Sequence, residues 1–170
     1  MPAPFVAILM GSDSDLPTMQ ATLDVLDKLS VPFEVKITSA HRTPDATHSY
    51  VRDADQRGCT VFIAAAGLAA HLAGTVAGLT LKPVIGVPMA GGPLNGEDAL
   101  LSTVMMPGGI PVATVAIGKA GAKNAGYLAA QIIALTDMTL ANRLQQDRAD
   151  NAASVIAKDK ELQQQLAKKH

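Results

Sequence analysis

The stretch FVAILMGSDSD, residues 5–15, decides the fold that we expect for this chain. Residues 5–10 are a continuous apolar run, which is typical of a strand buried on both faces of a parallel sheet. From Asp15 to Leu29, leucine and methionine recur at intervals of three and four residues, which predicts an amphipathic helix capped by Ser14 or Asp15. A buried strand, a short polar turn and a helix, in this order, open a βαβ unit.

The rest of the chain repeats this alternation of strand and helix. We expect strands at residues 33–38, 60–65, 84–87 and 111–117, and helices at residues 44–57, 97–105 and 120–135, with a Gly/Ala-rich helix that ends near residue 81. This pattern predicts an α/β fold, a three-layer sandwich around a five-stranded parallel sheet of the flavodoxin-like or Rossmann-like kind. We expect a single α/β domain at residues 1–136.

Residues 137–170 are expected to form a C-terminal helical extension of this domain. Its surface is mostly charged and polar, but six apolar residues interrupt it. They are Leu140, Leu144, Val155, Ile156, Leu162 and Leu166. Because an exposed apolar stripe is better covered than left in water, we expect the extension to pack on a neighbouring subunit, with a frayed end as the alternative.

The composition limits the kinds of protein that this chain can be. Its 170 residues have the size of one domain. The 14 Lys and Arg and the 15 Asp and Glu residues leave a net charge of -1, so we expect neither nucleic acid nor a membrane surface as a partner. The uncharged stretch 60–81 is mostly Ala, Gly and Thr around His71, and a buried strand and helix explain it better than a membrane span.

The cysteine count and the first residues of the chain indicate the cellular compartment of the protein. The single cysteine, Cys59, excludes an internal disulfide, and its apolar surroundings predict a buried thiol. No Lys or Arg precedes Val6, so the start of the chain does not resemble a secretory signal. We therefore expect a cytoplasmic protein.

The polar segment GSDSD, residues 11–15, has the features of an anion site. It lies where a strand meets a helix N-terminus, so free backbone amides and the helix dipole favour a negative group, and Ser12 and Ser14 add hydroxyl donors. A phosphate suits such a segment, and the Asp15 carboxylate is placed to accept hydrogen bonds from ribose hydroxyls. The segment matches neither the Walker nor the GxGxxG pattern. The alternative is an ordinary helix cap.

A second segment, SAHRTP at residues 39–44, follows the next expected strand. Arg42 can bind a phosphate or carboxylate with its planar fork, and His41 can accept a proton. The small residues Ser39 and Ala40 let a ligand approach closely. Because the carboxyl ends of parallel strands meet at one sheet edge, this segment and residues 11–15 are expected to lie together. The alternative is a surface histidine without a role.

A third turn, AAAGLAAHLAG at residues 64–74, has almost no side-chain bulk, so a flat ring could lie against its backbone. His71 within it is either a core histidine or a ligand contact, and the residues alone leave both open. One Cys and four scattered His residues, at 41, 48, 71 and 170, lack the spacing of a ligand set, so no metal site is expected.

Taken in order, GSDSD at 11–15, SAHRTP at 39–44, AAHL at 69–72 and MPGGIPV at 106–112 with AIG at 116–118 resemble the N5-carboxyaminoimidazole ribonucleotide mutase family (PurE, class I). The resemblance extends from Val6 to about Leu144. It implies an octamer of flavodoxin-like subunits without metal or organic cofactor, working in purine biosynthesis. The reaction moves a carboxylate from the exocyclic nitrogen to ring carbon 4, and an ATP-dependent synthetase supplies the ribonucleotide substrate.

The same resemblance assigns roles to individual residues. His41 is the implied general acid and base. Ser12, Ser14 and Arg42 hold the 5'-phosphate, and Asp15 holds the ribose. The turn after the third strand encloses the imidazole and the migrating carboxyl group. The implied substrate-binding residues are Ser12, Ser14, Asp15, Ser39, Arg42, Ala66, Gly67, His71 and Leu72.

Five positions depart from the family pattern. Ala65 and Leu68 replace Gly, Ala73 replaces Pro, Gly91 replaces Ser and Met105 replaces Gln. Leu68 has the largest expected effect, because a branched side chain adopts positive φ only at a cost. Two alternatives to the mutase stay open. One is a carboxylase that adds carbon dioxide directly to aminoimidazole ribonucleotide, and the other is a nucleotide-binding module without catalysis.

Overall fold

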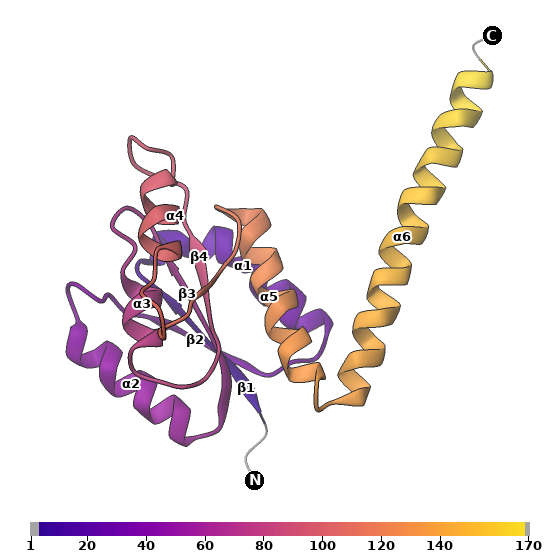
Figure 1. The fold of residues 1–170 in the computed structure, drawn as a ribbon. Helices are drawn as coiled ribbons and strands as arrows, with labels where there is room; N and C mark the ends of the chain where they lie inside the picture. The colour runs from indigo at the N-terminus through magenta and orange to yellow at the C-terminus, as the bar shows by residue number, and fades with distance from the viewer. Residues whose placement is uncertain (1–3, 169–170) are drawn as a thin grey trace.

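A computed structural model describes residues 4–168 of the chain. All strands belong to one parallel sheet with the order β2-β1-β3-β4-β5 (Figure 1). The strands are β1 Phe5–Met10, β2 Phe33–Ile37, β3 Cys59–Ala66, β4 Val84–Pro88 and β5 Ala113–Thr114. This order is that of flavodoxin-like folds, which confirms the expected fold class.

Helices cover both faces of this sheet, which makes three layers (Figure 1). Helices α1 and α5 pack on one face, and α2, α3 and α4 lie on the other. The helices are α1 Leu16–Lys28, α2 Pro44–Gln56, α3 Leu72–Ala77, α4 Glu97–Val104, α5 Lys119–Ala134 and α6 Met138–Ala167, with a short 3-10 helix, η1, at Asp13–Asp15.

Strand β1 lies at the centre of the core, and all six of its residues are buried. Val6 and Ile8 face the layer of α1 and α5, whereas Ala7 and Leu9 face α2 and α3. The expected burial on both faces is thus confirmed. Cys59 begins the neighbouring strand β3 and is also buried, and burial raises the pKa of its thiol to about 11.

Two expected elements are shorter than their patterns suggest. The helix expected to end near residue 81 is α3, which ends at Ala77, because Gly74 and Gly78 weaken the helix. The strand expected at residues 111–117 pairs with β4 only at Ala113–Thr114. It is an edge strand between Pro111, which lacks an amide hydrogen, and the left-handed Gly118.

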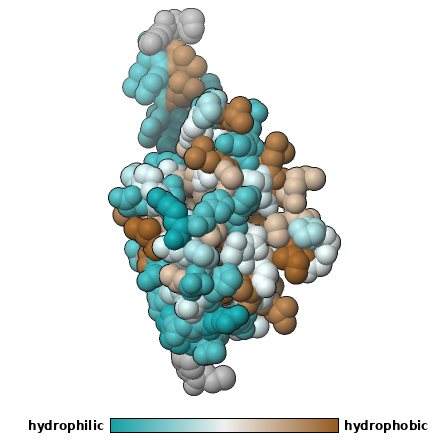
Figure 2. All heavy atoms as spheres, turned by 90° about the vertical axis from the view of Figure 1, so that its left-hand side faces the viewer, coloured by the Kyte–Doolittle hydropathy of each residue, from teal (hydrophilic) through white to brown (hydrophobic). Residues whose placement is uncertain are grey.

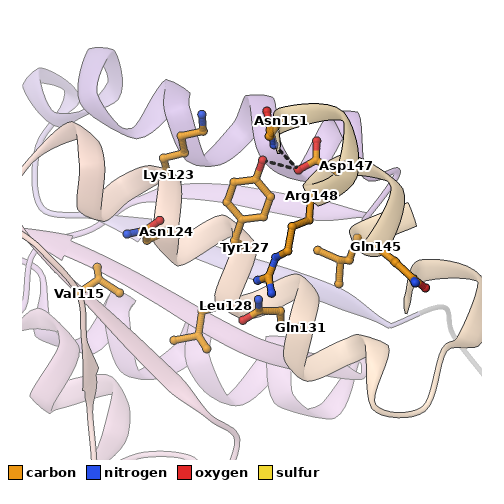
Figure 3. A pocket seen from close by; sticks show the side chains of 11 residues that line it. Val115, Lys123, Asn124, Tyr127, Leu128, Gln131, Gln145, Asp147, Arg148 and Asn151 are labelled. Carbon is orange, nitrogen blue, oxygen red and sulfur yellow. Dashed lines mark hydrogen bonds between the residues drawn. The ribbon is translucent and has the colours of Figure 1, made fainter. Parts of the chain in front are cut away.

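Helix α6 is attached to the body through its first three turns. The Arg143 Nη1 group donates to the backbone oxygen of Leu29 at 2.8 Å. The buried carboxylate of Asp147 forms an ion pair with Lys28. It also accepts hydrogen bonds from Tyr127, at 2.8 Å, and from Asn151, at 3.0 Å (Figure 3). The ammonium group of Lys28 holds the pKa of Asp147 below its usual range.

Beyond this attachment the helix leaves the body. Residues 148–168 are exposed throughout, and the helix projects away from the sheet (Figure 1). Figure 2 shows the side of the body on which hydrophilic and hydrophobic side chains are intermingled, with the end of α6 projecting past it. Within residues 4–168, none of the helices combines the length and apolar character needed to span a bilayer. Residues 1–3 and 169–170, including His170, lie outside the described part.

Gly86 of β4 provides a test of the packing between the sheet and α4. A Cβ atom added there would lie 2.9 Å from Cγ1 of Val112 and still closer to Cγ2 of the buried Thr103. Gly86→Ala is therefore expected to lower the free energy of unfolding by about 1–3 kcal/mol through overpacking. The control is Gly108→Ala, where the added carbon meets open space. Urea denaturation measures both, and equal stability of the two variants would contradict this packing.

Asp147 predicts how stability depends on pH. Because its pKa is lower in the folded than in the unfolded chain, its stabilising effect is present above the unfolded pKa of about 3.9 and is lost as the pH falls through the folded pKa. Asp147→Asn is expected to be less stable than the wild type at pH 7, with the difference narrowing below about pH 4. Thermal unfolding across this range measures the difference, and Asp159→Asn, on the exposed part of α6, should show none.

Candidate active site

Three turns meet at the carboxyl edge of the sheet, following β1, β2 and β3. The chain turns to opposite sides of β1 to form β2 and β3, so this edge contains the topological switch point where α/β sheets bind ligands. Two contacts join the turns. Arg42 Nη2 donates to the backbone oxygen of Gly11 at 3.3 Å, and His41 Nε2 lies 2.7 Å from His71 Nδ1. The expected juxtaposition of residues 11–15 and 39–44 is present, and the turn after β3 joins them through His71.

The turn after β1 is held by a capping box. The Ser12 hydroxyl accepts from the amide of Ser14 at 3.2 Å, and the Asp15 carboxylate accepts from the amide of Ser12 at 3.1 Å. The free amides expected here are therefore partly occupied within the turn, because η1 precedes α1. The hydroxyls of Ser12 and Ser14 lie 2.9 Å apart and form the exposed polar surface of this turn with Asp13.

Asp15 lies half-buried in the same turn. Burial raises the pKa of its carboxyl group, and the nearby charge of Asp13 adds to this effect, while the hydrogen bond from the Ser12 amide partly offsets both. Although it directly precedes α1, Asp15 makes no side-chain cap to that helix. Its acceptor function serves the turn itself. An oxygen already oriented at the site edge suits a hydroxyl donor better than an anion.

The turn after β2 is compact and presents two exposed side chains. The amide of Thr43 donates to the backbone oxygen of Ser39 at 2.9 Å, and the amide of Arg42 donates to the Ser39 hydroxyl at 3.1 Å. Pro44 then begins α2. His41 and Arg42 are exposed at the tip of this turn. Ser39 therefore shapes the turn through both of its oxygens.

His41 and His71 form a pair across two turns. Their rings are nearly perpendicular, with centroids 4.8 Å apart. His71 is exposed at the N-terminus of α3, so the structure favours a site residue over a core histidine. In the neutral pair one ring donates and the other accepts across the 2.7 Å contact, which leaves His41 Nδ1 as the ring nitrogen for a ligand. The imidazole of His41 can therefore transfer a proton to or from a ligand through Nδ1.

The turn after β3 forms the floor beside this pair. Ala66 and Gly67 are partly buried, and Gly67 lies against Met89 of the loop after β4. Leu68 has φ 55°, so this turn does require the positive φ that glycine adopts readily. Leu72 is 2% exposed and packs into the core, so its side chain supports the turn from below and does not face the site edge.

Two contributions to the site carry no signal in the sequence pattern. The hydroxyl of Ser102, on α4, accepts from the amide of Ala70 at 3.0 Å and so ties α4 to the turn that carries His71. The loop after β4 reaches the same turn through Met89 and Gly92, whose added Cβ would meet Leu68. Within the described residues 4–168, no three His, Cys, Asp or Glu side chains gather as a possible metal site.

A separate hollow of about 770 Å³ lies between α5 and α6, away from the three turns (Figure 3). It is lined mainly by polar side chains of the two helices, together with the apolar residues Leu128, Leu144 and Val115. Asp147, with its partners Tyr127 and Asn151, lies at one side of the hollow, and Arg148 reaches across it toward Gln131 (Figure 3). None of the residues predicted for the site lines this hollow.

Comparisons with known proteins agree on one family. A family model described as AIR carboxylase matches residues 5–154. The N5-carboxyaminoimidazole ribonucleotide mutase of Bacillus subtilis is 53% identical over 159 residues, which cover 94% of this chain and 98% of the relative. The mutase of the same name from Escherichia coli is 51% identical over 151 residues, 89% of either chain. The solved structure of Treponema denticola PurE matches with a TM-score of 0.85 and 31% identity, over 94% of this chain and 98% of that one.

Proposed function

The chain belongs to the AIR carboxylase family, and we propose that it is an N5-carboxyaminoimidazole ribonucleotide mutase of purine biosynthesis. The resemblance found in the sequence is confirmed by relatives of that name, which are 51–54% identical to this chain over most of its length. The structural observation that carries the proposal is the contact between His41 and His71 at the switch point, which presents a proton-transfer group beside the expected ribonucleotide site.

The substrate is proposed to lie across the three turns. The hydroxyls of Ser12 and Ser14 and the guanidinium of Arg42 would receive the 5'-phosphate, and Arg42 already lies against the turn after β1 through Gly11. The exposed edge of Asp15 would accept from the ribose hydroxyls. Backbone around Ala66 and Gly67, with Leu72 packed beneath it, would support the imidazole ring, and Ser39 would act by shaping the turn that carries Arg42.

His41 is proposed to act twice in the reaction. Protonated His41 gives its proton to the exocyclic nitrogen, the bond between that nitrogen and the carboxyl carbon breaks, and carbon dioxide is released. Ring carbon 4 then attacks the trapped carbon dioxide to form the new carbon–carbon bond. Neutral His41 removes the proton from carbon 4, which returns the enzyme to its starting state without net proton uptake. A closed, dry site would favour recapture over escape of the gas.

A second candidate function is direct carboxylation of aminoimidazole ribonucleotide by carbon dioxide. The description of the matching family model, AIR carboxylase, favours this candidate. The relatives named as mutases favour the first. Both candidates form the same bond at carbon 4, and both use a base for its proton. They differ in whether the carboxyl group arrives on the substrate or from solution.

Supply of the two substrates separately distinguishes these candidates. The purified chain is expected to convert freshly made N5-carboxyaminoimidazole ribonucleotide to the carbon-4 carboxylated product, and to leave aminoimidazole ribonucleotide with dissolved carbon dioxide unchanged. The product is followed by its ultraviolet absorbance. Conversion of the second substrate alone would make the chain a carboxylase. Binding without conversion of either would leave a nucleotide-binding module.

His41→Asn is the matched variant for this assay. Asparagine keeps a polar group near the place of the His41 Nδ1 atom, but it lacks the distal nitrogen that contacts His71 and cannot transfer a proton at neutral pH. Turnover is expected to fall by at least about 100-fold, while substrate affinity stays within a few-fold, because the phosphate and ribose contacts remain. A variant that keeps most of its turnover would remove His41 from the mechanism.

The assembly and the cellular setting are also proposed. The family resemblance implies an octamer in the cytoplasm, with an ATP-dependent synthetase delivering the labile substrate. Four exposed apolar residues on the projecting half of α6 support contact with another copy, because a helix without tertiary packing has little stability of its own. They are Val155, Ile156, Leu162 and Leu166, which are 67%, 70%, 50% and 45% exposed in the single chain.

Ile156→Glu tests this assembly, since it places a charge on the apolar stripe of α6 without touching the body of the chain. We expect a smaller particle by light scattering at equal concentration. Lys160→Glu, which also adds negative charge to the exposed half of the helix, is the control and should keep the wild-type mass. An unchanged mass for Ile156→Glu would contradict a role of this stripe in assembly.

A further inference from the structure

Three threonine hydroxyls meet beneath the turn that carries His41 and Arg42. Thr38 follows the end of β2, Thr43 precedes α2, and Thr47 lies in the first turns of α2. The Oγ1 atoms of Thr38 and Thr47 are 2.7 Å apart, and those of Thr38 and Thr43 are 3.2 Å apart. We call these three residues the threonine triad. Thr38 and Thr47 are buried, at 4% and 0% exposure.

The triad is bonded to the backbone at both ends of the turn. The amide of Ser39 donates to the Thr43 hydroxyl at 3.0 Å. That hydroxyl in turn donates to the backbone oxygen of Ser39 at 3.2 Å. The Thr47 hydroxyl donates to the backbone oxygen of Thr43 at 3.1 Å. Because the hydroxyl protons of Thr43 and Thr47 both go to backbone oxygens, the Thr38 hydroxyl is the donor in its contact with Thr47. Every buried hydroxyl of the triad thus has a hydrogen-bond partner.

The position of His41 depends on this turn. His41 and Arg42 are exposed and lie between residues 39 and 43, the two points at which the triad holds the backbone. The His41 imidazole contacts His71, which belongs to a different turn, at 2.7 Å. A turn free to shift would change that contact, and a displacement of about 1 Å at a reacting group can cost roughly 100-fold in rate.

We propose that Thr38 and Thr47 are positioning residues, whose buried hydroxyl pair holds the turn of His41 and Arg42 in its productive place. The proposal rests on the proposed function, since it assigns the triad a purpose in that reaction. The hydroxyls touch neither substrate nor imidazole. They act through the bond from the Thr47 hydroxyl to the backbone oxygen of Thr43, the residue whose own hydroxyl bonds the backbone of Ser39. The triad thus does for the turn after β2 what Ser102 does for the turn after β3.

Thr47→Val is the decisive substitution, because valine has the shape of threonine but leaves Thr38 without its acceptor. In the intact chain, kcat for the ribonucleotide substrate is expected to fall about ten-fold. KM is expected to rise less than kcat falls, because Arg42 moves with the turn while Ser12 and Ser14, which lie outside it, keep their place at the phosphate. Thr47→Ser keeps the hydroxyl and should restore kcat to within about two-fold. Amide hydrogen exchange at Ser39 and Thr43 should quicken in Thr47→Val and not in Thr47→Ser.

Thr22→Val is the matched control. Thr22 is also 0% exposed, and its hydroxyl donates at 2.6 Å to the backbone oxygen of Ala122, which joins α1 to α5 and not the site turns. It should lose thermal stability as Thr47→Val does, with kcat unchanged. Equal kcat in the two valine variants, or a Thr47→Ser variant as slow as Thr47→Val, would overturn the proposal.

A second variant and a measurement independent of turnover cover the two ways in which this experiment could fail. If Thr47→Val does not fold, Thr38→Val carries the same comparison, because it removes the other half of the 2.7 Å contact. If the wild-type chain converts no ribonucleotide, the proposed function fails while the exchange measurement still decides whether the triad holds the turn. Unchanged exchange at Ser39 and Thr43 in both valine variants would show that it does not.

Discussion

The candidate site depends on the backbone ladders that join β1 to β2 on one side and to β3 on the other. Met10, the last residue of β1, pairs with Ile37 and with Ala65, so the three following turns begin side by side. His41 and His71 are thirty residues apart in the chain, and their contact exists only because these strands are in register. The chemistry of the site is therefore a product of strand pairing.

Small residues let the layers close tightly around those ladders. On one face, Gly126 of α5 lies so near α1 that an added Cβ would be 3.1 Å from the backbone oxygen of Thr22. On the other, Gly86 admits Thr103 of α4 against the sheet. The side-chain volume missing from the core is replaced by close backbone contact, which suits a chain with 3% aromatic residues. A rigid sheet then supports turns that are themselves exposed.

The sequence predicts those features whose causes are local. β1 has the expected ends because its apolar run is bounded by Pro4 and Gly11, and α2 begins at Pro44 because proline suits a first helical position. β5 is shorter than predicted because it pairs with a single neighbouring strand, β4. α3 is shorter than predicted because its glycines weaken the helix. The threonine triad draws on a strand end, a turn and a helix, whose spacing matches no single periodicity. The contact between His41 and His71 needs the register of three strands, which the pattern of apolar residues does not contain.

The buried thiol of Cys59 determines how the chain behaves under oxidation. Burial raises the pKa of this thiol to about 11, so the reactive thiolate is scarce at neutral pH, and the sulfur lies in the core between the sheet and α2. The chain has no second cysteine. Copies of it cannot be joined by disulfides while folded, and peroxide finds no exposed thiol to oxidise in the folded chain. A cysteine introduced on the surface would be the one site open to thiol-specific labels.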